Sequence, residues 1–101
     1  MKYRYLKRIK DPITRALAES FGRLIVALRT EEKLARRIVC QQLEINGKRM
    51  KQLEEGTVIP RLDEVVKLAH LYEVSYASLL KETLQDGAFL KAYDQEVWLK
   101  V

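Results

Sequence analysis

The sequence predicts a small all-α protein with one folded domain and room for a terminal extension. The chain has 101 residues, of which 48% are apolar and 33% charged, proportions that are ordinary for a globular domain. Only four glycines and two prolines interrupt it. Apolar residues recur at steps of three and four along much of the chain, as they do on amphipathic helices. These three observations favour short helices joined by tight turns.

The first helix is predicted from about 12 to 29. Asp11 can accept hydrogen bonds from the free N–H groups of the first turn, and Pro12 suits the first helical position. The polar run 30–33 then interrupts the apolar pattern, so we expect a turn there, with a helix that continues through the run as the alternative. The apolar stripe consists of Ile13, Leu17, Phe21, Leu24, Ile25 and Leu28.

Two short helices are predicted next, over 35–43 and about 46–55. Asn46 can cap the second of them, and Gly56 can end it in a left-handed conformation. The apolar positions that would face inward are Val39, Cys40, Leu43, Met50 and Leu53.

The last third of the chain is predicted to hold a fourth helix over 62–71 and a fifth after Ser75. The pair Asp86-Gly87 then breaks the pattern. Beyond it the apolar steps favour one more helix, but the alternation within 96–101 is equally compatible with a strand. The apolar positions concerned are Leu79, Leu80, Leu84, Phe89, Tyr93 and Val97.

Positive charge is concentrated in two segments. Residues 1–10 contain five bases and no acid, and residues 35–61 contain six bases and three acids. The segment 11–34 is neutral and 62–101 has four bases and seven acids, so the whole chain has a net charge of +5. Such segments favour a nucleic-acid partner, because each phosphate that a basic side chain neutralises releases counterions.

The basic arm at residues 1–10 has two interpretations of equal weight. Tyr3 and Tyr5 alternate with basic residues, so the arm could be a solvated tail that adds phosphate contacts. It could instead pair as a strand with residues 96–101, within one chain or across a dimer. The other aromatic residues, which we expect in packing or interface positions, are Phe89, Tyr93 and Trp98.

Several functional classes find no support in the sequence. We expect Cys40, the single cysteine, to be a small core residue, and His70 has no cluster of Cys or acids around it, so no metal and no cofactor is expected. Glu54 and Glu55 point in different directions on a helix, so they do not converge on a substrate, and Glu54 is expected to form a structural ion pair instead. No phosphate loop or catalytic triad pattern occurs, so we expect no enzyme. No apolar run reaches the ~18 residues that span a bilayer, and no secretory signal is evident, so we expect a cytoplasmic protein without a membrane partner.

Residues 34–56 meet the requirements of a helix-turn-helix. The first helix of that motif needs a small residue where the second crosses it, and the turn needs an apolar plug. Cys40 supplies the small residue and Ile45 the plug. The second helix needs an apolar docking face opposite a polar face that can enter the major groove. These two faces are formed by Met50 and Leu53, and by Lys48, Lys51 and Gln52.

Residues 21–80 resemble the phage-repressor and Cro-like helix-turn-helix family, a compact five-helix domain. The resemblance implies an all-α, five-helix repressor-like helix-turn-helix domain at 11–84, with an N-terminal basic arm or extended first helix. It leaves 1–10 as the arm and 85–101 as a C-terminal extension and candidate dimerisation element. The ordered positions that carry the resemblance are Leu34, Val39-Cys40, Leu43, Ile45, Met50, Leu53-Glu54-Glu55-Gly56, Pro60, Leu62, Ala69, Val74 and Leu79-Leu80.

The resemblance also implies a function and its residues. It implies a bacterial or phage-encoded transcriptional regulator that binds double-stranded DNA through residues 46–55, as a homodimer on half-sites about one helical turn apart. The base-reading positions would be Gly47, Lys48, Lys51 and Gln52. The phosphate-contacting positions would be Arg36 and Arg61, with Arg37 and Arg49 added to them.

Three positions depart from the pattern of that family. Glu44 occupies the turn position that normally holds Gly, Ala35 replaces the usual Thr or Ser cap, and Gly47 has no side chain with which to read a base. Together with the apolar C-terminal segment, Glu44 and Gly47 motivate an alternative function. The chain could be a protein-interaction module, such as an antitoxin-like or partner-binding protein, that keeps the same fold and binds a protein partner.

Overall fold

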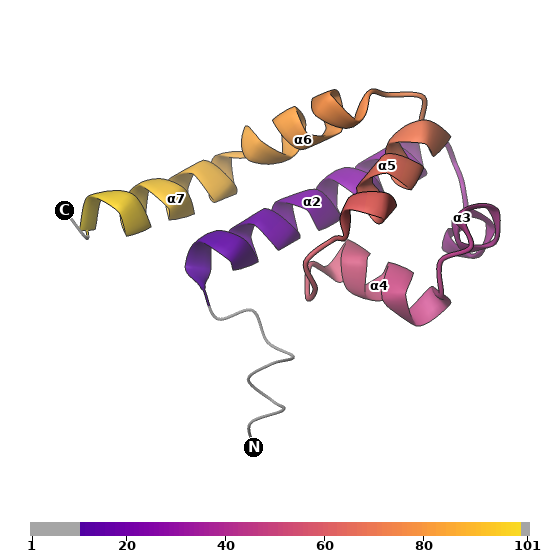
Figure 1. The fold of residues 1–101 in the computed structure, drawn as a ribbon, viewed down its shortest axis with the longest axis horizontal. Coiled ribbons are helices and arrows are strands. Elements are labelled where there is room, and N and C mark those ends of the chain that lie inside the picture. The colour runs from indigo at the N-terminus through magenta and orange to yellow at the C-terminus, as the bar shows by residue number, and fades with distance from the viewer. Residues whose placement is uncertain (1–10, 100–101) are drawn as a thin grey trace, which may run out of the picture.

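The part of the chain that the structure describes, residues 11–99, is built from six α-helices and contains no strand (Figure 1). The computed structural model therefore confirms the all-α class. It has one helix more than the expected five, because the segment after Asp86, where a helix and a strand were both considered, is helical through Leu99. The arm 1–10 and positions 100–101 lie outside the described residues. The helices are α2 (Pro12–Glu31), α3 (Arg36–Leu43), α4 (Gly47–Glu55), α5 (Leu62–Leu71), α6 (Tyr76–Leu84) and α7 (Gly87–Leu99).

Helix α2, with 20 residues, is the longest of the described helices, and it begins at the predicted position. The backbone N–H of Thr14 donates to Asp11 Oδ2 at 3.0 Å, so Asp11 is the N-cap, and Pro12 occupies the first turn. The helix ends at Glu31, and Lys33 follows in a left-handed conformation with φ 57°. A turn therefore follows the first helix as predicted, but at positions 32–33, because Thr30 and Glu31 still belong to α2, and a helix that continues through the run is excluded.

The helices pack around α2. Helix α4 contacts one side of it, while α6 and α7 run along another side (Figure 1). Helix α5 packs against α6, and α3 packs against both α4 and α5. Ile45, the predicted plug of the turn, is buried as expected. The core that these contacts enclose is formed by Phe21, Ile25, Val39, Ile45, Met50, Leu53, Val65, Leu68, Ala69, Tyr72 and Leu79.

Two glycines allow α2 and the end of α4 to approach each other closely. A Cβ on Gly22 would lie 2.6 Å from the carbonyl oxygen of Glu54, and a Cβ on Gly56 would lie 2.6 Å from the Cα of Glu19. Gly56 also ends α4 with φ 72°, the left-handed conformation that the sequence predicted for it. Backbone contact at these two points fixes where the C-terminal end of α4 lies on α2.

Candidate nucleic-acid interface

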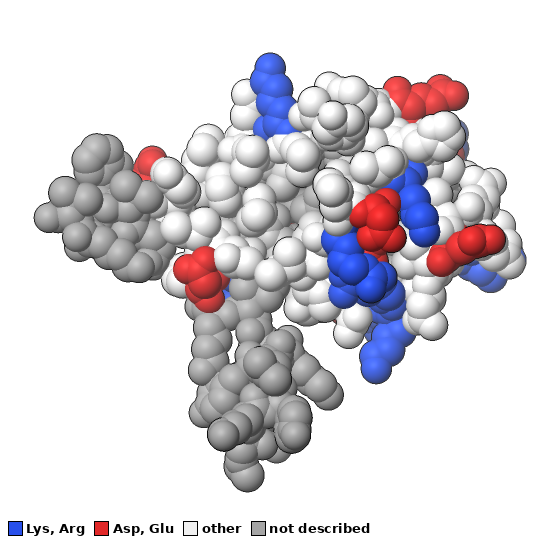
Figure 2. All heavy atoms as spheres, viewed as in Figure 1, with Lys and Arg blue, Asp and Glu red and all other residues white. Residues whose placement is uncertain are grey.

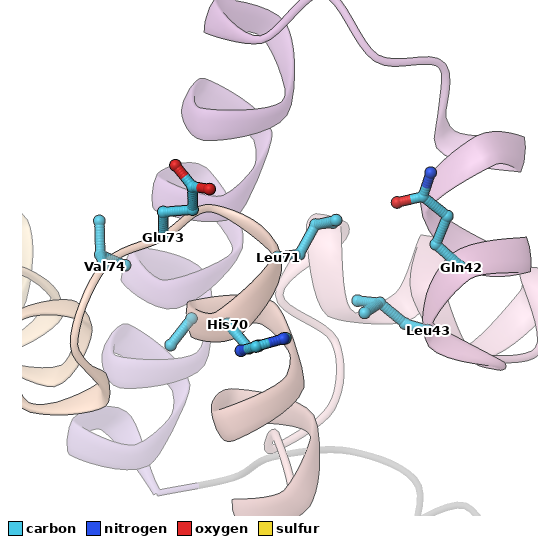
Figure 3. Close-up of a pocket in the computed structure, with 7 residues that line it drawn as sticks. Gln42, Leu43, His70, Leu71, Glu73 and Val74 are labelled. Atoms are coloured by element: carbon cyan, nitrogen blue, oxygen red, sulfur yellow. The ribbon is translucent and has the colours of Figure 1, made fainter.

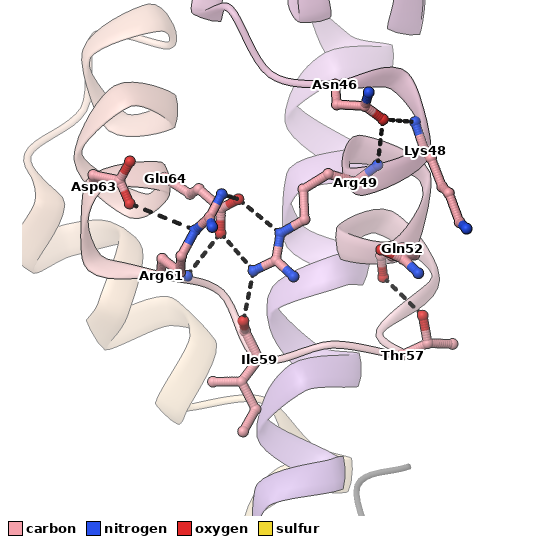
Figure 4. A network of polar contacts seen from close by, with 9 residues as sticks. All are labelled: Asn46, Lys48, Arg49, Gln52, Thr57, Ile59, Arg61, Asp63 and Glu64. Carbon is pink, nitrogen blue, oxygen red and sulfur yellow. Dashed lines mark hydrogen bonds and ion pairs between the residues drawn. The ribbon is translucent and has the colours of Figure 1, made fainter. Parts of the chain in front are cut away.

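The turn between α3 and α4 is short and strained at one residue. Glu44 ends α3 with φ 55° and ψ 41°, a left-handed conformation that costs a non-glycine residue roughly 1–2 kcal/mol. Asn46 then caps α4, because its side chain accepts from the backbone N–H groups of Lys48 at 2.8 Å and Arg49 at 3.4 Å (Figure 4). At the start of α3, Ala35 provides no side-chain cap. The predicted local geometry of Glu44, Asn46 and Ala35 is therefore confirmed.

The four predicted base-reading residues share the outer face of α4. They fall within an arc of about 140°, given the 100° that each residue turns around a helix. Gly47, Lys48 and Lys51 are exposed and Gln52 is half-buried, while Met50 and Leu53 on the opposite side are buried. No heavy atom lies within 4 Å of a Cβ built on Gly47, so neither packing nor a positive φ requires glycine there. We call these four residues the outer face of α4.

A buried glutamate holds the inner side of α4 to α2 and α3. Arg29 of α2 donates to both carboxylate oxygens of Glu54, at 2.7 and 3.1 Å, and Arg36 of α3 donates to Oε1 at 3.0 Å. Hydrogen bonding to Glu54 raises the pKa of Arg29 above its ordinary value, even though burial opposes the charged form. The structural ion pair that the sequence predicted for Glu54 is confirmed.

A second buried glutamate holds α4 to α5. Arg49 of α4 donates to both oxygens of Glu64, at 2.8 and 2.9 Å, and also to the carbonyl oxygen of Ile59 at 2.9 Å (Figure 4). The backbone N–H of Arg61 donates to Glu64 at 2.7 Å and its guanidinium does so at 3.2 Å. Burial alone would raise the pKa of Glu64, but these hydrogen bonds and the two positive charges outweigh it and hold that pKa below its ordinary value.

Each buried glutamate is therefore bound by an inner and an outer arginine. The inner arginines, Arg29 and Arg49, have side chains that are 18% and 23% exposed, and each forms two hydrogen bonds with its carboxylate. The outer arginines, Arg36 and Arg61, are 42% and 67% exposed. An outer arginine can turn toward a ligand without leaving its glutamate unpaired. The Glu54 cluster has two guanidinium groups for one carboxylate, a net charge of +1, whereas the Glu64 cluster is neutral, because Arg61 also lies 3.9 Å from Asp63 Oδ1.

This arrangement separates the four predicted phosphate-contacting residues. Arg36 and Arg61 are outer arginines, whereas Arg49 is committed to Glu64 and Ile59. Arg37 is exposed. Figure 2 shows Lys and Arg side chains gathered over α4 and the start of α5, with acidic side chains next to them.

Sequence reasoning missed three residues that position α4, namely Gly22, Arg29 and Glu64. A glycine inside a helical pattern is a general signal for a close packing contact, which is what Gly22 makes with α4. Glu64 lies three residues after the N-cap residue Arg61, at the spacing of a capping box, and its side chain does accept from the backbone N–H of Arg61. No comparable local signal points to Arg29, because its partner lies 25 residues away.

The described residues offer neither a metal-binding cluster nor a membrane-spanning helix. They contain no group of three or more His, Cys, Asp or Glu that could hold a metal ion. Among them, no helix has both the length and the apolar character that crossing a bilayer requires. No protein-family model, curated protein or solved structure matches the chain.

Proposed function

We propose that this protein is a transcriptional regulator that binds double-stranded DNA, with α3 and α4 acting as a helix-turn-helix and α4 entering the major groove. The observation that carries the proposal is the outer face of α4. Lys48, Lys51 and Gln52 project from a helix whose opposite side is buried. Lys can reach the O6 and N7 acceptors of guanine, and Gln can bond adenine through two atoms.

The contacts behind this face support the proposal, because a helix that reads bases has to be held in one orientation. Glu54 ties α4 to α2 and α3, and Glu64 ties it to α5. Gly22 and Gly56 set the depth of the packing on α2. With four such attachments, DNA would meet a preformed surface, and little ordering free energy would be lost on binding.

Phosphate contacts are assigned to the outer arginines on either side of α4. Arg36 is the first residue of α3, and Arg61 is the N-cap residue of α5. Arg37 follows Arg36 and adds an exposed positive charge. The arm 1–10 would add up to five more charges. In this proposal the protein has no catalytic role. It is encoded by a bacterium or a phage and acts in the cytoplasm.

The proposal is tested by measuring affinity for a selected duplex and for random duplexes against salt concentration. Log affinity should fall linearly with log salt, with a slope of about −0.9 for each phosphate neutralised. Lys48→Ala and Gln52→Ala should each weaken binding to the selected duplex by roughly tenfold, because a good base contact contributes about 1–3 kcal/mol of discrimination.

Matched controls are available on α7, away from α4. Lys91 and Gln95 are exposed there, and Lys91→Ala and Gln95→Ala should leave base preference unchanged. A salt response that is flat, or a loss of affinity as large in the α7 variants as in the α4 variants, contradicts the proposal.

A second candidate function, a protein-interaction module, is favoured by one specific observation. Large apolar side chains remain exposed on α6 and α7, which lie across α2 from α4. The strained acid Glu44 beside α4 also fits a protein partner better than DNA. A stoichiometric protein partner that competes with DNA for the outer face of α4 would favour this function. The exposed apolar residues are Tyr76, Leu80, Leu84, Leu90 and Tyr93.

A further inference from the structure

A groove lies between the C-terminal ends of α3 and α5, and its lining shares no residue with the outer face of α4. It consists of two adjoining hollows that have Gln42, Leu43 and His70 in common. In Figure 3, Leu43 of α3 and His70 of α5 face each other across one of these hollows. We call the two hollows together the α3–α5 groove.

The floor of the α3–α5 groove is apolar along its length. Leu43 and Val66 supply apolar side chains in one hollow, and Leu71 and Val74 supply them in the other. Both hollows are open to solvent, whereas a small-molecule site buries most of its ligand. An apolar floor with a polar rim is the composition of a contact between proteins. The groove therefore suits a segment of a protein chain.

The charged side chains that line the groove are two acids and one base. Glu44 lies beside Lys67 in one hollow, and Glu73 lines the other. With His70 neutral, two carboxylates against one ammonium give this lining a net charge of −1, while the whole chain carries +5. The free carbonyl groups at the C-terminal ends of α3 and α5 add about half a negative charge each. The groove is thus a negative region on a positive protein.

Neither of the two glutamates favours the helix end at which it lies. Glu44 follows α3 with φ 55°, and Glu73 follows α5 with φ 56°, positions at which Gly or Asn is usual. A carboxylate at a helix C-terminus is also repelled by the helix dipole. A positive charge bound in the groove would offset this repulsion at both ends.

We propose that the α3–α5 groove binds a short segment of a protein partner in which apolar side chains stand between basic ones. The apolar side chains rest on the floor of the groove. One basic side chain pairs with Glu73, and a second pairs with Glu44, where Lys67 makes the attraction weaker. The charge pairs select the partner, and the buried apolar area holds it. Because the contact is much smaller than a standard interface, a dissociation constant on the order of 100 μM is expected.

The test uses NMR of the full chain, labelled with ¹⁵N and without DNA, and three synthetic peptides of equal length. The first peptide has leucines between two lysines. In the second, glutamates replace the lysines, and in the third, serines replace the leucines. The first peptide should shift the amide signals of Leu43, Val66, Leu71 and Val74, and the other two should bind about tenfold more weakly or less. The net charge of +5 attracts the acidic peptide, so tighter binding of the basic one reports the groove itself.

Charge variants test the assignment of the two acids. Glu73→Gln should weaken binding of the first peptide about three- to fivefold, as loss of an exposed ion pair does. Glu44→Gln should weaken it less, because Lys67 already opposes a basic side chain there. Lys67→Gln should strengthen binding by about twofold for the same reason. Glu82→Gln, at an exposed acid of α6, is the matched control and should leave binding unchanged.

An apolar variant tests the floor of the groove. Val66→Ser should weaken binding several-fold, because Val66 is 46% exposed and available to a partner. Leu84→Ser on α6, where Leu84 is 47% exposed, is the matched control. Melting temperatures of both variants should stay close to that of the wild type, so a loss of binding would not reflect unfolding.

Absence of binding by the first peptide at millimolar concentration, or equal binding of all three peptides, overturns the inference. Shifts of the groove signals with protein concentration alone would assign the groove to a second copy of the chain and overturn it as well. Tighter binding of the acidic peptide in the groove would reverse the proposed charge of the partner. Because no DNA is present, a chain that binds the peptide but no DNA refutes only the proposed function. A chain that binds DNA but not the peptide refutes only the groove.

Discussion

The two sides of α4 differ in burial and in packing. Its inner side is buried and closely packed, with Gly22 of α2 in backbone contact and Glu54 buried against two arginines. Its outer side is exposed, and Gly47 there has open space where a side chain could stand. The inner side therefore governs stability, and the outer side is available to govern binding. Substitutions on the two sides should separate these two quantities.

The largest effect is expected from a buried glutamate on the inner side. Glu64→Ala leaves the poorly exposed Arg49 without its carboxylate, and removal of one partner from a buried ion pair costs about 3–5 kcal/mol. Urea denaturation should show this as a lower midpoint. Glu55→Ala, on exposed α4 surface, is the control and should change the free energy of unfolding by less than about 0.5 kcal/mol. Equal effects of the two substitutions would show that the Glu64 cluster is not a structural element.

The next largest effect is expected at the closest packing contact. Gly22→Ala places a methyl group 2.6 Å from the carbonyl oxygen of Glu54, so α4 has to move and the free energy of unfolding should fall by about 1–3 kcal/mol. Gly87→Ala, where a Cβ meets no atom within 4 Å, is the matched control. Thermal denaturation measures both. If Gly22→Ala is as stable as Gly87→Ala, then α2 and α4 do not approach as closely as described.

A smaller effect should appear in the pH dependence of stability. The pKa of Glu64 is lower in the folded protein than its ordinary value of 4.5, so its stabilising contribution is present above pH 4.5. That contribution is lost as the pH falls through the lowered pKa, because the unfolded chain then binds more protons than the folded one. Asp86 acts in the same direction, since its pKa is lowered by hydrogen bonds from the Phe89 backbone and Arg23 and by the charge of Arg23.

Free energies of unfolding from pH 7 down to pH 3 measure this contribution. Glu64→Gln should flatten the decline below pH 4.5 relative to the wild type, and Asp86→Asn reports the share that belongs to Asp86. An unchanged acid limb in both variants would contradict the assignment of these lowered pKa values.

The smallest effect on stability is expected at Glu44. Substitution there should also change DNA affinity, so it separates stability from binding most clearly. Glu44→Gly removes left-handed strain and should stabilise the fold by about 1 kcal/mol or less. It also removes an acid beside α4, so DNA affinity should rise. Glu73, with φ 56° at the end of α5, is the matched control, because Glu73→Gly relieves the same strain away from α4. Equal gains in affinity for both variants would show that Glu44 does not lie near bound DNA.

Much of the helical frame was predictable from local signals. Asp11, Asn46 and Ser75 cap their helices, and each accepts from backbone N–H groups two or three residues ahead. Gly56 ends α4, and the boundaries of 62–71 agree with the structure. A helix and a strand were both open for the last segment, because Phe89, Tyr93 and Val97 fit a helical period whereas the alternation within 96–101 fits a period of 2. In the structure this segment is the helix α7, which packs along α2.

The candidate site was predictable only in part. The outer face of α4 follows from helical periodicity, so Gly47, Lys48, Lys51 and Gln52 could be grouped in advance. Among the basic residues, however, sequence alone could not distinguish Arg49 from Arg61. Both arginines bind Glu64. The side chain of Arg49 is only 23% exposed, whereas that of Arg61 is 67% exposed.

The sequence by itself determined where helices begin and end and which residues share a face, because caps and periodicity involve neighbours within about four residues. Only the tertiary structure decided the partners of the buried glutamates. Arg29 and Arg36 lie 25 and 18 residues from Glu54, and Arg49 lies 15 residues from Glu64. It also decided that Leu62, an apolar residue in an amphipathic helix, faces outward. These outcomes depend on how helices cross, and the crossing is set by contacts such as that of Gly22 with α4.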